Sequence, residues 1–135
     1  MLSTTKIILV DDHLLFREGL KLLIEREGMG EVIAEAENGK VFLELLETHD
    51  PDLVLMDIEM PVMDGLEAIR KALAIRPGLK ILVFTIFYER EYFDAMINSG
   101  AMGFVLKSSG KQELEKAIRT VIRGEYYFQK GRLKC

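Results

Sequence analysis

Apolar residues follow two alternating patterns along the chain. Five short runs are almost wholly apolar and end at polar or turn-forming residues, which is typical of strands covered on both faces of a sheet. These runs occupy residues 7–10, 32–36, 53–56, 81–85 and 104–106. Between and after them, apolar residues recur at intervals of three and four, most regularly over residues 114–122, which predicts amphipathic helices. The pattern therefore predicts five units, each a strand followed by a helix.

Strict alternation of strands and helices predicts an α/β fold with helices on both faces of a parallel sheet, because parallel neighbours need a crossover connection. The strands over residues 7–10, 53–56 and 81–85 are the most apolar and belong at the centre of the sheet. The strand over residues 32–36 carries Glu35, which suits an edge. We therefore expect a flavodoxin-like, doubly wound (βα)5 fold with a five-stranded parallel sheet of order 2-1-3-4-5.

The composition is typical of one globular domain. The chain has 135 residues, a formal net charge of -4 and 49% hydrophobic residues, so neither a second domain nor a basic nucleic-acid-binding surface is indicated. No apolar run approaches the roughly 20 residues of a membrane span. The single cysteine, Cys135, excludes an internal disulfide and favours the cytoplasm. We expect one domain over residues 1–123 and a basic C-terminal linker stub over residues 124–135.

Polar residues end or follow four of the predicted strands. Asp11 and Asp12 follow the first strand, Asp57 follows the third, Thr85 ends the fourth, and Lys107 follows the fifth. In open parallel sheets, ligands bind beyond the carboxyl ends of the strands, at the point where neighbouring connections leave in opposite directions. Each residue alone has a simpler explanation, such as a cap, a turn or a solvated charge. Their arrival at one edge of the sheet indicates a site.

The acids predict a metal ion and a phosphate ligand. Two unit charges about 5 Å apart repel by roughly 3 kcal/mol at an effective dielectric of about 20, so three carboxylates together need a compensating cation. Mg²⁺ prefers oxygen ligands and commonly takes one or two carboxylates with phosphate oxygens. The Thr85 hydroxyl and the Lys107 amine can both bind phosphoryl oxygens. Asp57, on a central strand, is best placed to act as a nucleophile and form an aspartyl phosphate.

Motifs in this order resemble the receiver domain of two-component response regulators over residues 6–123. The motifs are Asp11-Asp12, Asp57 with Met60-Pro61 and Asp64-Gly65, Thr85, and the run from Gly103 to Lys107. The resemblance implies Mg²⁺-dependent transfer of a phosphoryl group from a sensor histidine kinase to Asp57. It also implies metal ligation by Asp11, Asp12, Asp57 and the backbone carbonyl of Glu59, phosphate binding by Thr85 and Lys107, and a switch formed by Thr85 and Phe104.

The switch assignment has a geometric consequence. Phe104 and Lys107 lie three residues apart along one strand, so their side chains point to opposite faces of the sheet. We therefore expect Phe104 to be able to point outward. The resemblance implies that it rotates inward as Thr85 moves, and that phosphorylation thereby alters the face formed by the fourth helix, the fifth strand and the fifth helix.

The stretch Asp11-Asp12-His13 with residues 16–20 is similar to the subfamily that carries a C-terminal LuxR-type helix-turn-helix domain. This similarity implies control of transcription by a longer protein, with DNA contacted only through a domain that these residues do not contain. The basic stub favours a fragment over a stand-alone receiver that acts by protein-protein contact. We also expect that the protein can form a homodimer and that it does not contact a membrane. For His13 we expect a structural or partner-facing role.

One alternative from another class uses similar residues. Phosphatases of the haloacid-dehalogenase type also form an aspartyl phosphate with Mg²⁺, a threonine and a lysine. Their nucleophile follows the first strand and their metal acids come late, which is the reverse of the order here. A nucleotide-binding flavodoxin-like domain is disfavoured because no loop carries a glycine-rich phosphate cradle. We therefore expect no enzyme activity beyond the domain's own phosphorylation and dephosphorylation.

Overall fold

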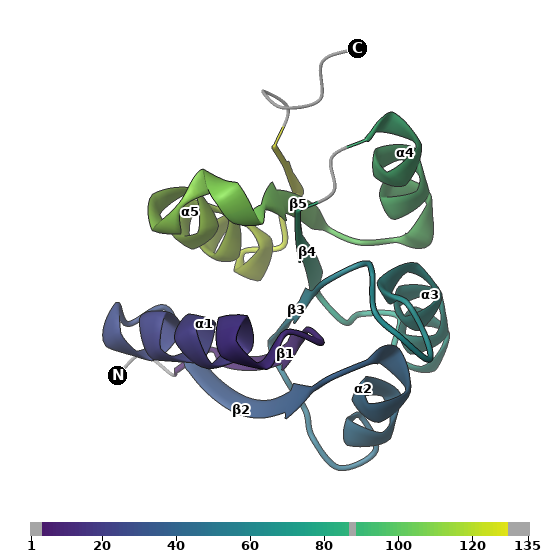
Figure 1. The fold of residues 1–135 in the computed structure, drawn as a ribbon, viewed down its shortest axis with the longest axis horizontal. Coiled ribbons are helices and arrows are strands. Elements are labelled where there is room, and N and C mark those ends of the chain that lie inside the picture. Colours follow the sequence, from purple (N-terminus) through teal and green to yellow (C-terminus); the bar gives the residue numbers. More distant parts are fainter. Residues whose placement is uncertain (1–3, 87–88, 130–135) are drawn as a thin grey trace.

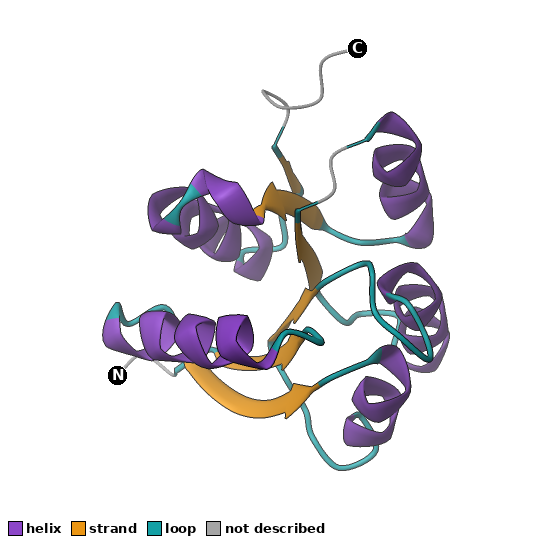
Figure 2. Ribbon diagram, viewed as in Figure 1, coloured by secondary structure: helices purple, strands orange, loops and turns teal. Residues whose placement is uncertain are grey.

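The computed structural model describes residues 4–86 and 89–129, in which strands and helices alternate (Figures 1 and 2). The strands are β1 (Lys6–Val10), β2 (Glu31–Ala36), β3 (Leu53–Met56), β4 (Ile81–Thr85), β5 (Gly103–Leu106) and β6 (Tyr127–Phe128). The helices are α1 (Leu14–Arg26), α2 (Gly39–Leu45), α3 (Gly65–Ile75), α4 (Arg90–Ser99), the short 3-10 helix η1 (Lys107–Ser109) and α5 (Lys111–Ile122). In the described residues, no helix has the length and apolar character needed to cross a membrane.

The strands form one parallel sheet of order β2-β1-β3-β4-β5-β6. The order of the first five confirms the prediction, including the edge position of β2. The expected count of five strands is wrong, because Tyr127 and Phe128 pair with β5 as a sixth strand. Two residues are too few to show an alternating pattern, and they lie in the segment assigned to the linker stub. The basic end of that segment, residues 130–135, lies outside the described residues.

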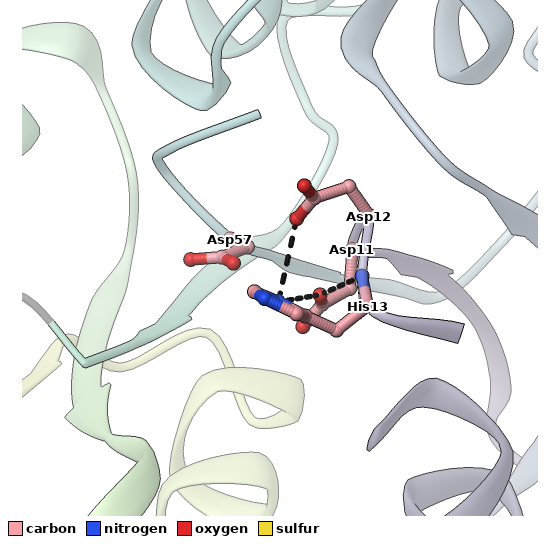
Figure 3. A group of neighbouring side chains, drawn as sticks. All are labelled: Asp11, Asp12, His13 and Asp57. Carbon is pink, nitrogen blue, oxygen red and sulfur yellow. Dashed lines mark hydrogen bonds and ion pairs between the residues drawn. The ribbon is translucent and has the colours of Figure 1, made fainter. Parts of the chain in front are cut away.

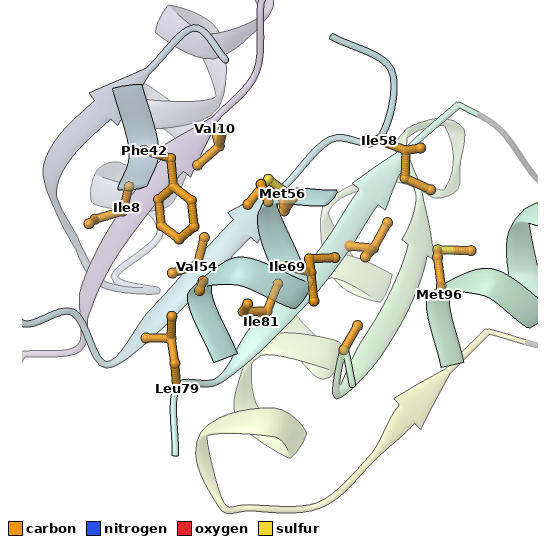
Figure 4. Packing of buried hydrophobic residues seen from close by; sticks show 14 of the residues in the cluster. Ile8, Val10, Phe42, Val54, Met56, Ile58, Ile69, Leu79, Ile81 and Met96 are labelled. Atoms are coloured by element: carbon orange, nitrogen blue, oxygen red, sulfur yellow. The ribbon is translucent and has the colours of Figure 1, made fainter. Parts of the chain in front are cut away.

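Helices cover both faces of the sheet: α2, α3 and α4 lie on one face, and α1 and α5 on the other (Figure 1). Successive side chains of a strand point to opposite faces, so each strand contributes to two cores. Along β1, Ile8 packs in the core that contains Phe42 of α2 and Ile69 of α3 (Figure 4), whereas Ile7 packs in the core that contains Ile24 of α1. Burial on both faces holds the central strands, and the residues that follow them, in fixed positions.

Candidate functional site

Two carboxylates meet at the carboxyl ends of β1 and β3. The last residues of these strands are paired in the sheet, so Asp11 and Asp57, which follow them, are neighbours. Both are almost wholly buried, with 4% and 5% of their surface exposed. Asp12 and His13 follow on the connection to α1, and potential ligand atoms of the four residues lie within 4.8 Å of one another (Figure 3). The structure therefore brings together the three acids that the sequence predicts.

Lys107 supplies the positive charge of the site. Its Nζ atom lies 2.6 Å from Asp11 Oδ2 and 3.2 Å from Asp57 Oδ2, and 9% of its side chain is exposed. The same atom lies 4.2 Å from the centroid of the Phe16 ring, a cation–π contact. One ammonium group thus pairs with two buried carboxylates. The pairing leaves a net negative charge in the buried part of the site, before the charge of Asp12 is added.

The Asp57 carboxylate is held from several directions. Its Oδ1 atom accepts a hydrogen bond of 2.8 Å from the Ile58 amide. Burial is the largest effect on this group and raises its pKa above the ordinary value of 3.8; the Lys107 charge opposes that rise, and the Asp11 charge adds to it. Hydrogen bonds from Thr85 and from the Ile58 amide also lower the pKa. Thr85 is wholly buried at the end of β4 and reaches the site, as predicted.

The loop after Asp57 returns close to the strand that it leaves. A Cβ atom at Gly65 would lie 2.1 Å from the carbonyl oxygen of Asp57, so only glycine allows this approach. The Gly65 amide donates a hydrogen bond of 2.7 Å to the Ile58 carbonyl, and α3 begins at Gly65, capped by the side chain of Asp64. Within the loop, Val62 has a φ of 70°, a left-handed conformation that is rare for a β-branched residue. The backbone therefore requires glycine at position 65, where the loop passes the Asp57 carbonyl.

An open pocket of about 840 Å³ gives access to the site. Asp12, Asp57, Glu59 and Lys107 line it together with apolar side chains of α1 and of the loop after β4. Glu59 thus lies at the site, and the assignment of its backbone carbonyl as a metal ligand stays a prediction. The buried Asp57 can be reached from solvent through this pocket.

Phe104 lies away from the acids, in the core on the other face of the sheet. It is wholly buried, and its ring packs edge-on against Phe93 of α4 with the centroids 5.9 Å apart. The opposite orientations of Phe104 and Lys107 agree with the period of the strand. In this structure Phe104 points inward, where Phe93 of α4 covers it, and the expectation that it can point outward stays a prediction. Nothing in the pattern of β5 itself reveals this contact.

Two further residues lie beside the acids: His13, for which the sequence predicts a structural or partner-facing role, and Arg17, whose place at the site the sequence does not predict. The His13 Nδ1 atom lies 3.4 Å from Asp12 Oδ1 and 3.5 Å from Asp11 Oδ1 (Figure 3), and the only signal for it is its place directly after the acids. Arg17 belongs to the polar face of α1 in the sequence pattern. In the structure its guanidinium group donates to the Asp11 carbonyl and pairs with Glu35 at 2.8 Å. Glu35 lies on β2, so no local pattern predicts this pair.

The sequence is similar to a known protein family and to proteins of several organisms. The family model of the response regulator receiver domain matches residues 7–119. The transcriptional regulatory protein DegU of Brevibacillus brevis is 38% identical over 122 residues, which cover 90% of this chain and 52% of that protein. The transcriptional regulatory protein YdfI of Bacillus subtilis (strain 168) is 42% identical over 129 residues, which cover 96% of this chain and 60% of that protein. The chain thus spans between half and two thirds of the length of these relatives.

Solved structures show the same likeness. The crystal structure of a two-component response regulator of the LuxR family from Aurantimonas sp. SI85-9A1 has a TM-score of 0.90 and 35% identity, covering 97% of this chain and 93% of that one. A DNA-binding response regulator of the LuxR family from Staphylococcus aureus has a TM-score of 0.82 and 30% identity, covering 87% of this chain and 98% of that one. Fold and sequence agree, and the chain belongs to the receiver domain family of two-component response regulators.

Proposed function

We propose that this receiver accepts a phosphoryl group on Asp57 from a sensor histidine kinase, and that the modified state changes the surface offered to its partners. The observation that supports this most directly is the sharing of Lys107 between two buried carboxylates, at 2.6 Å from Asp11 and 3.2 Å from Asp57. Burial of like charges with incomplete compensation destabilises a fold. Such an arrangement is therefore better explained by chemistry than by stability.

In the proposed reaction, an oxygen of the Asp57 carboxylate attacks the phosphorus atom. The bond between phosphorus and the donor breaks, and the leaving group keeps the electron pair. The hydrogen bond of 2.8 Å from the Ile58 amide orients the carboxylate before attack. Lys107 and the Thr85 hydroxyl then bind phosphoryl oxygens, which stabilises the charge that gathers there.

The acids at this edge suit Mg²⁺. Asp11, Asp12 and Asp57 offer carboxylate oxygens, which Mg²⁺ prefers, and the open pocket leaves space for the water ligands that it retains. We propose that these three residues hold the ion together with the backbone carbonyl of Glu59. When bound, Mg²⁺ neutralises charge on the phosphoryl group during transfer.

The whole protein is proposed to control transcription. DegU carries that role in its name, and the Aurantimonas structure is titled a LuxR-family response regulator. We propose that a C-terminal helix-turn-helix domain of a longer protein contacts DNA, that a homodimer forms through the face of α4, β5 and α5, and that the protein works in the cytoplasm. The net charge of -4 argues against DNA contact through the receiver itself.

Thr85 and Phe104 are proposed to relay phosphorylation to that face. Because Phe104 is already packed against Phe93, the response expected here is a repacking of this ring pair. NMR spectra recorded with and without a phosphoryl mimic should show shifted signals at both rings. Shifts confined to the loop after Asp57 would contradict the relay.

We propose that the domain catalyses only its own phosphorylation and dephosphorylation. The test is incubation with Mg²⁺ and an excess of a small acyl phosphate donor, followed by a turnover assay with a generic phosphate ester. Incorporation should level off at or below one phosphoryl group per chain, and the ester should not be hydrolysed. Steady hydrolysis of the ester would favour a phosphatase, and absence of incorporation would contradict the phosphoacceptor function.

A further inference from the structure

The short strand β6 holds the end of the described chain against β5. The Tyr127 amide donates to the Met102 carbonyl and the Gln129 amide to the Phe104 carbonyl, both at 3.0 Å. Gly103 makes this pairing possible, since a Cβ atom there would lie 2.7 Å from the Tyr127 carbonyl oxygen. Backbone hydrogen bonds alone hold so short a strand weakly. Its position therefore depends on its side chains.

The Gln129 side chain bonds to the chain on both sides of Lys107. Its Oε1 atom accepts a hydrogen bond of 2.9 Å from the amide of Leu106, the residue before Lys107. The hydroxyl of Ser109, two residues after Lys107, lies 3.0 Å from Oε1 and 2.7 Å from Nε2. Lys107 begins η1, so these contacts span the turn from which its ammonium group reaches Asp57.

The aromatic residues of β6 connect the same segment to two helices. The Phe128 ring packs edge-on against Phe93 of α4, with centroids 5.9 Å apart and an interplanar angle of 83°. The Tyr127 hydroxyl donates to the Glu113 carboxylate on α5. α4 follows the strand that ends in Thr85, and β5 leads into Lys107. β6 thus touches the elements that adjoin both phosphate-binding residues.

We propose that Gln129 is a positioning residue for Lys107, and that occupancy of the Asp57 site and docking of β6 stabilise each other. This inference rests on the proposed phosphoacceptor function. Phosphorylation brings the charge at Asp57 from about -1, that of its carboxylate, to about -1.5 to -2, which strengthens the attraction to Lys107. The contacts of Gln129 hold the turn where the lysine can reach this charge. Coupling between two sites is reciprocal, so a ligand whose binding Gln129 favours must also favour the docked position of Gln129.

The test measures binding of fluoroberyllate, a phosphoryl mimic, to the full chain in the presence of Mg²⁺. Gln129→Ala should weaken binding about fivefold, the factor expected for the net loss of one hydrogen bond. Ser109→Ala should weaken binding less, because the bond from the Leu106 amide remains. The double variant should bind no more weakly than Gln129→Ala, since Ser109 acts through its contact with Gln129. Gln112→Ala, at an exposed glutamine of α5, is the matched control and should bind as the wild type does.

Hydrogen exchange gives a second reading that a purely structural role would not change. Saturating fluoroberyllate should slow exchange of the Leu106 and Gln129 amides in the wild type. Melting temperatures identify a variant that does not fold, in which case Ser109→Ala carries the comparison. Wild-type affinity in Gln129→Ala, or unchanged exchange at both amides, would overturn this inference and leave the proposed function standing. Absence of fluoroberyllate binding to the wild type would overturn both.

Discussion

We call the side of the sheet where its strands begin the amino edge, and the side where they end the carboxyl edge. The same apolar strands form both edges, but the polar residues at the two edges differ. At the amino edge, an open pocket of about 620 Å³ lies around the starts of β1, β3 and β4. Its residues include Lys6 and Asp52, both exposed, and the Asp52 carboxylate accepts a hydrogen bond of 2.8 Å from the Lys6 amide. At the carboxyl edge, the side chains of Asp11 and Asp57 are each 6% exposed and share Lys107.

The difference shows which features point to function. Both edges carry polar groups and an open pocket, so neither property distinguishes them. Within the described residues, a group of acids or histidines able to hold a metal ion occurs only at the carboxyl edge. Charges that are exposed and satisfied one by one are compatible with a surface that only has to be soluble. Like charges that are buried together and share one partner lower the stability of the fold, and such arrangements are typical of functional sites.

The largest contrast between the edges should appear in phosphorylation. Asp57→Asn should abolish labelling by a small acyl phosphate donor with Mg²⁺, because an amide cannot act as the carboxylate nucleophile. Asp52→Asn, the same change at the amino edge, should keep the wild-type rate. Initial rates of phosphoryl incorporation check both variants, and equal loss in the two would remove the distinction between the edges.

The next contrast lies in stability. Lys107→Ala leaves two buried carboxylates without their cation and should lower the free energy of unfolding by about 3 kcal/mol. Lys80→Ala, at the amino edge, should change it by less than about 0.5 kcal/mol. Urea denaturation without metal measures both values. Similar losses of unfolding free energy in the two variants would mean that the ion pairs of Lys107 with Asp11 and Asp57 contribute little to stability.

A smaller effect is expected from Mg²⁺. An ion that binds only the folded acid cluster at ten times its dissociation constant should raise the free energy of unfolding by about 1.4 kcal/mol. Asp12→Ala should remove that gain, and Asp52→Ala should retain it. Thermal melts over a Mg²⁺ titration are the measurement. A wild-type melting temperature that does not respond to Mg²⁺ would count against the metal site.

The smallest effect concerns pH. Because burial raises the pKa of Asp57 above 3.8, the folded state binds this proton more tightly than the unfolded state. The resulting stabilisation is present in acid and is lost as the pH rises through the raised pKa. Without metal, the free energy of unfolding of Asp57→Asn minus that of the wild type should grow as the pH rises from about 4 through the raised pKa of Asp57. Denaturation curves over this range give the difference, and a constant or falling difference would contradict the effect of burial.

The sequence is sufficient to predict the frame of the fold and the centre of the site. Unbroken apolar runs identify the strands that are covered on both faces, and the difference in apolarity between central strands and β2 agrees with the order 2-1-3-4-5 of a doubly wound fold. Once the sheet is parallel, the carboxyl ends of its strands share one edge, so Asp11, Asp57, Thr85 and Lys107 must approach one another. Both predictions, the strands and the convergence of their carboxyl ends, can be made without knowing any contact between distant residues.

The features that escape prediction depend on contacts between distant residues. β6 is too short to show a period, and its position depends on bonds from Gln129 to Leu106 and Ser109. Arg17 belongs to a polar helix face in the pattern, and only the folded chain shows its pair with Glu35 on β2. The orientation of Phe104 depends on α4 in the same way. Local patterns describe how each element is covered, but they do not identify the residue that covers it.

The most direct test of this account locates the phosphoryl group itself. The domain is labelled by a small acyl phosphate donor with Mg²⁺, the acyl phosphate is trapped by borohydride reduction, and the modified residue is identified by mass spectrometry. We predict a single modified position, Asp57. Modification of Asp11, Asp12 or a histidine in place of Asp57 would contradict the central assignment.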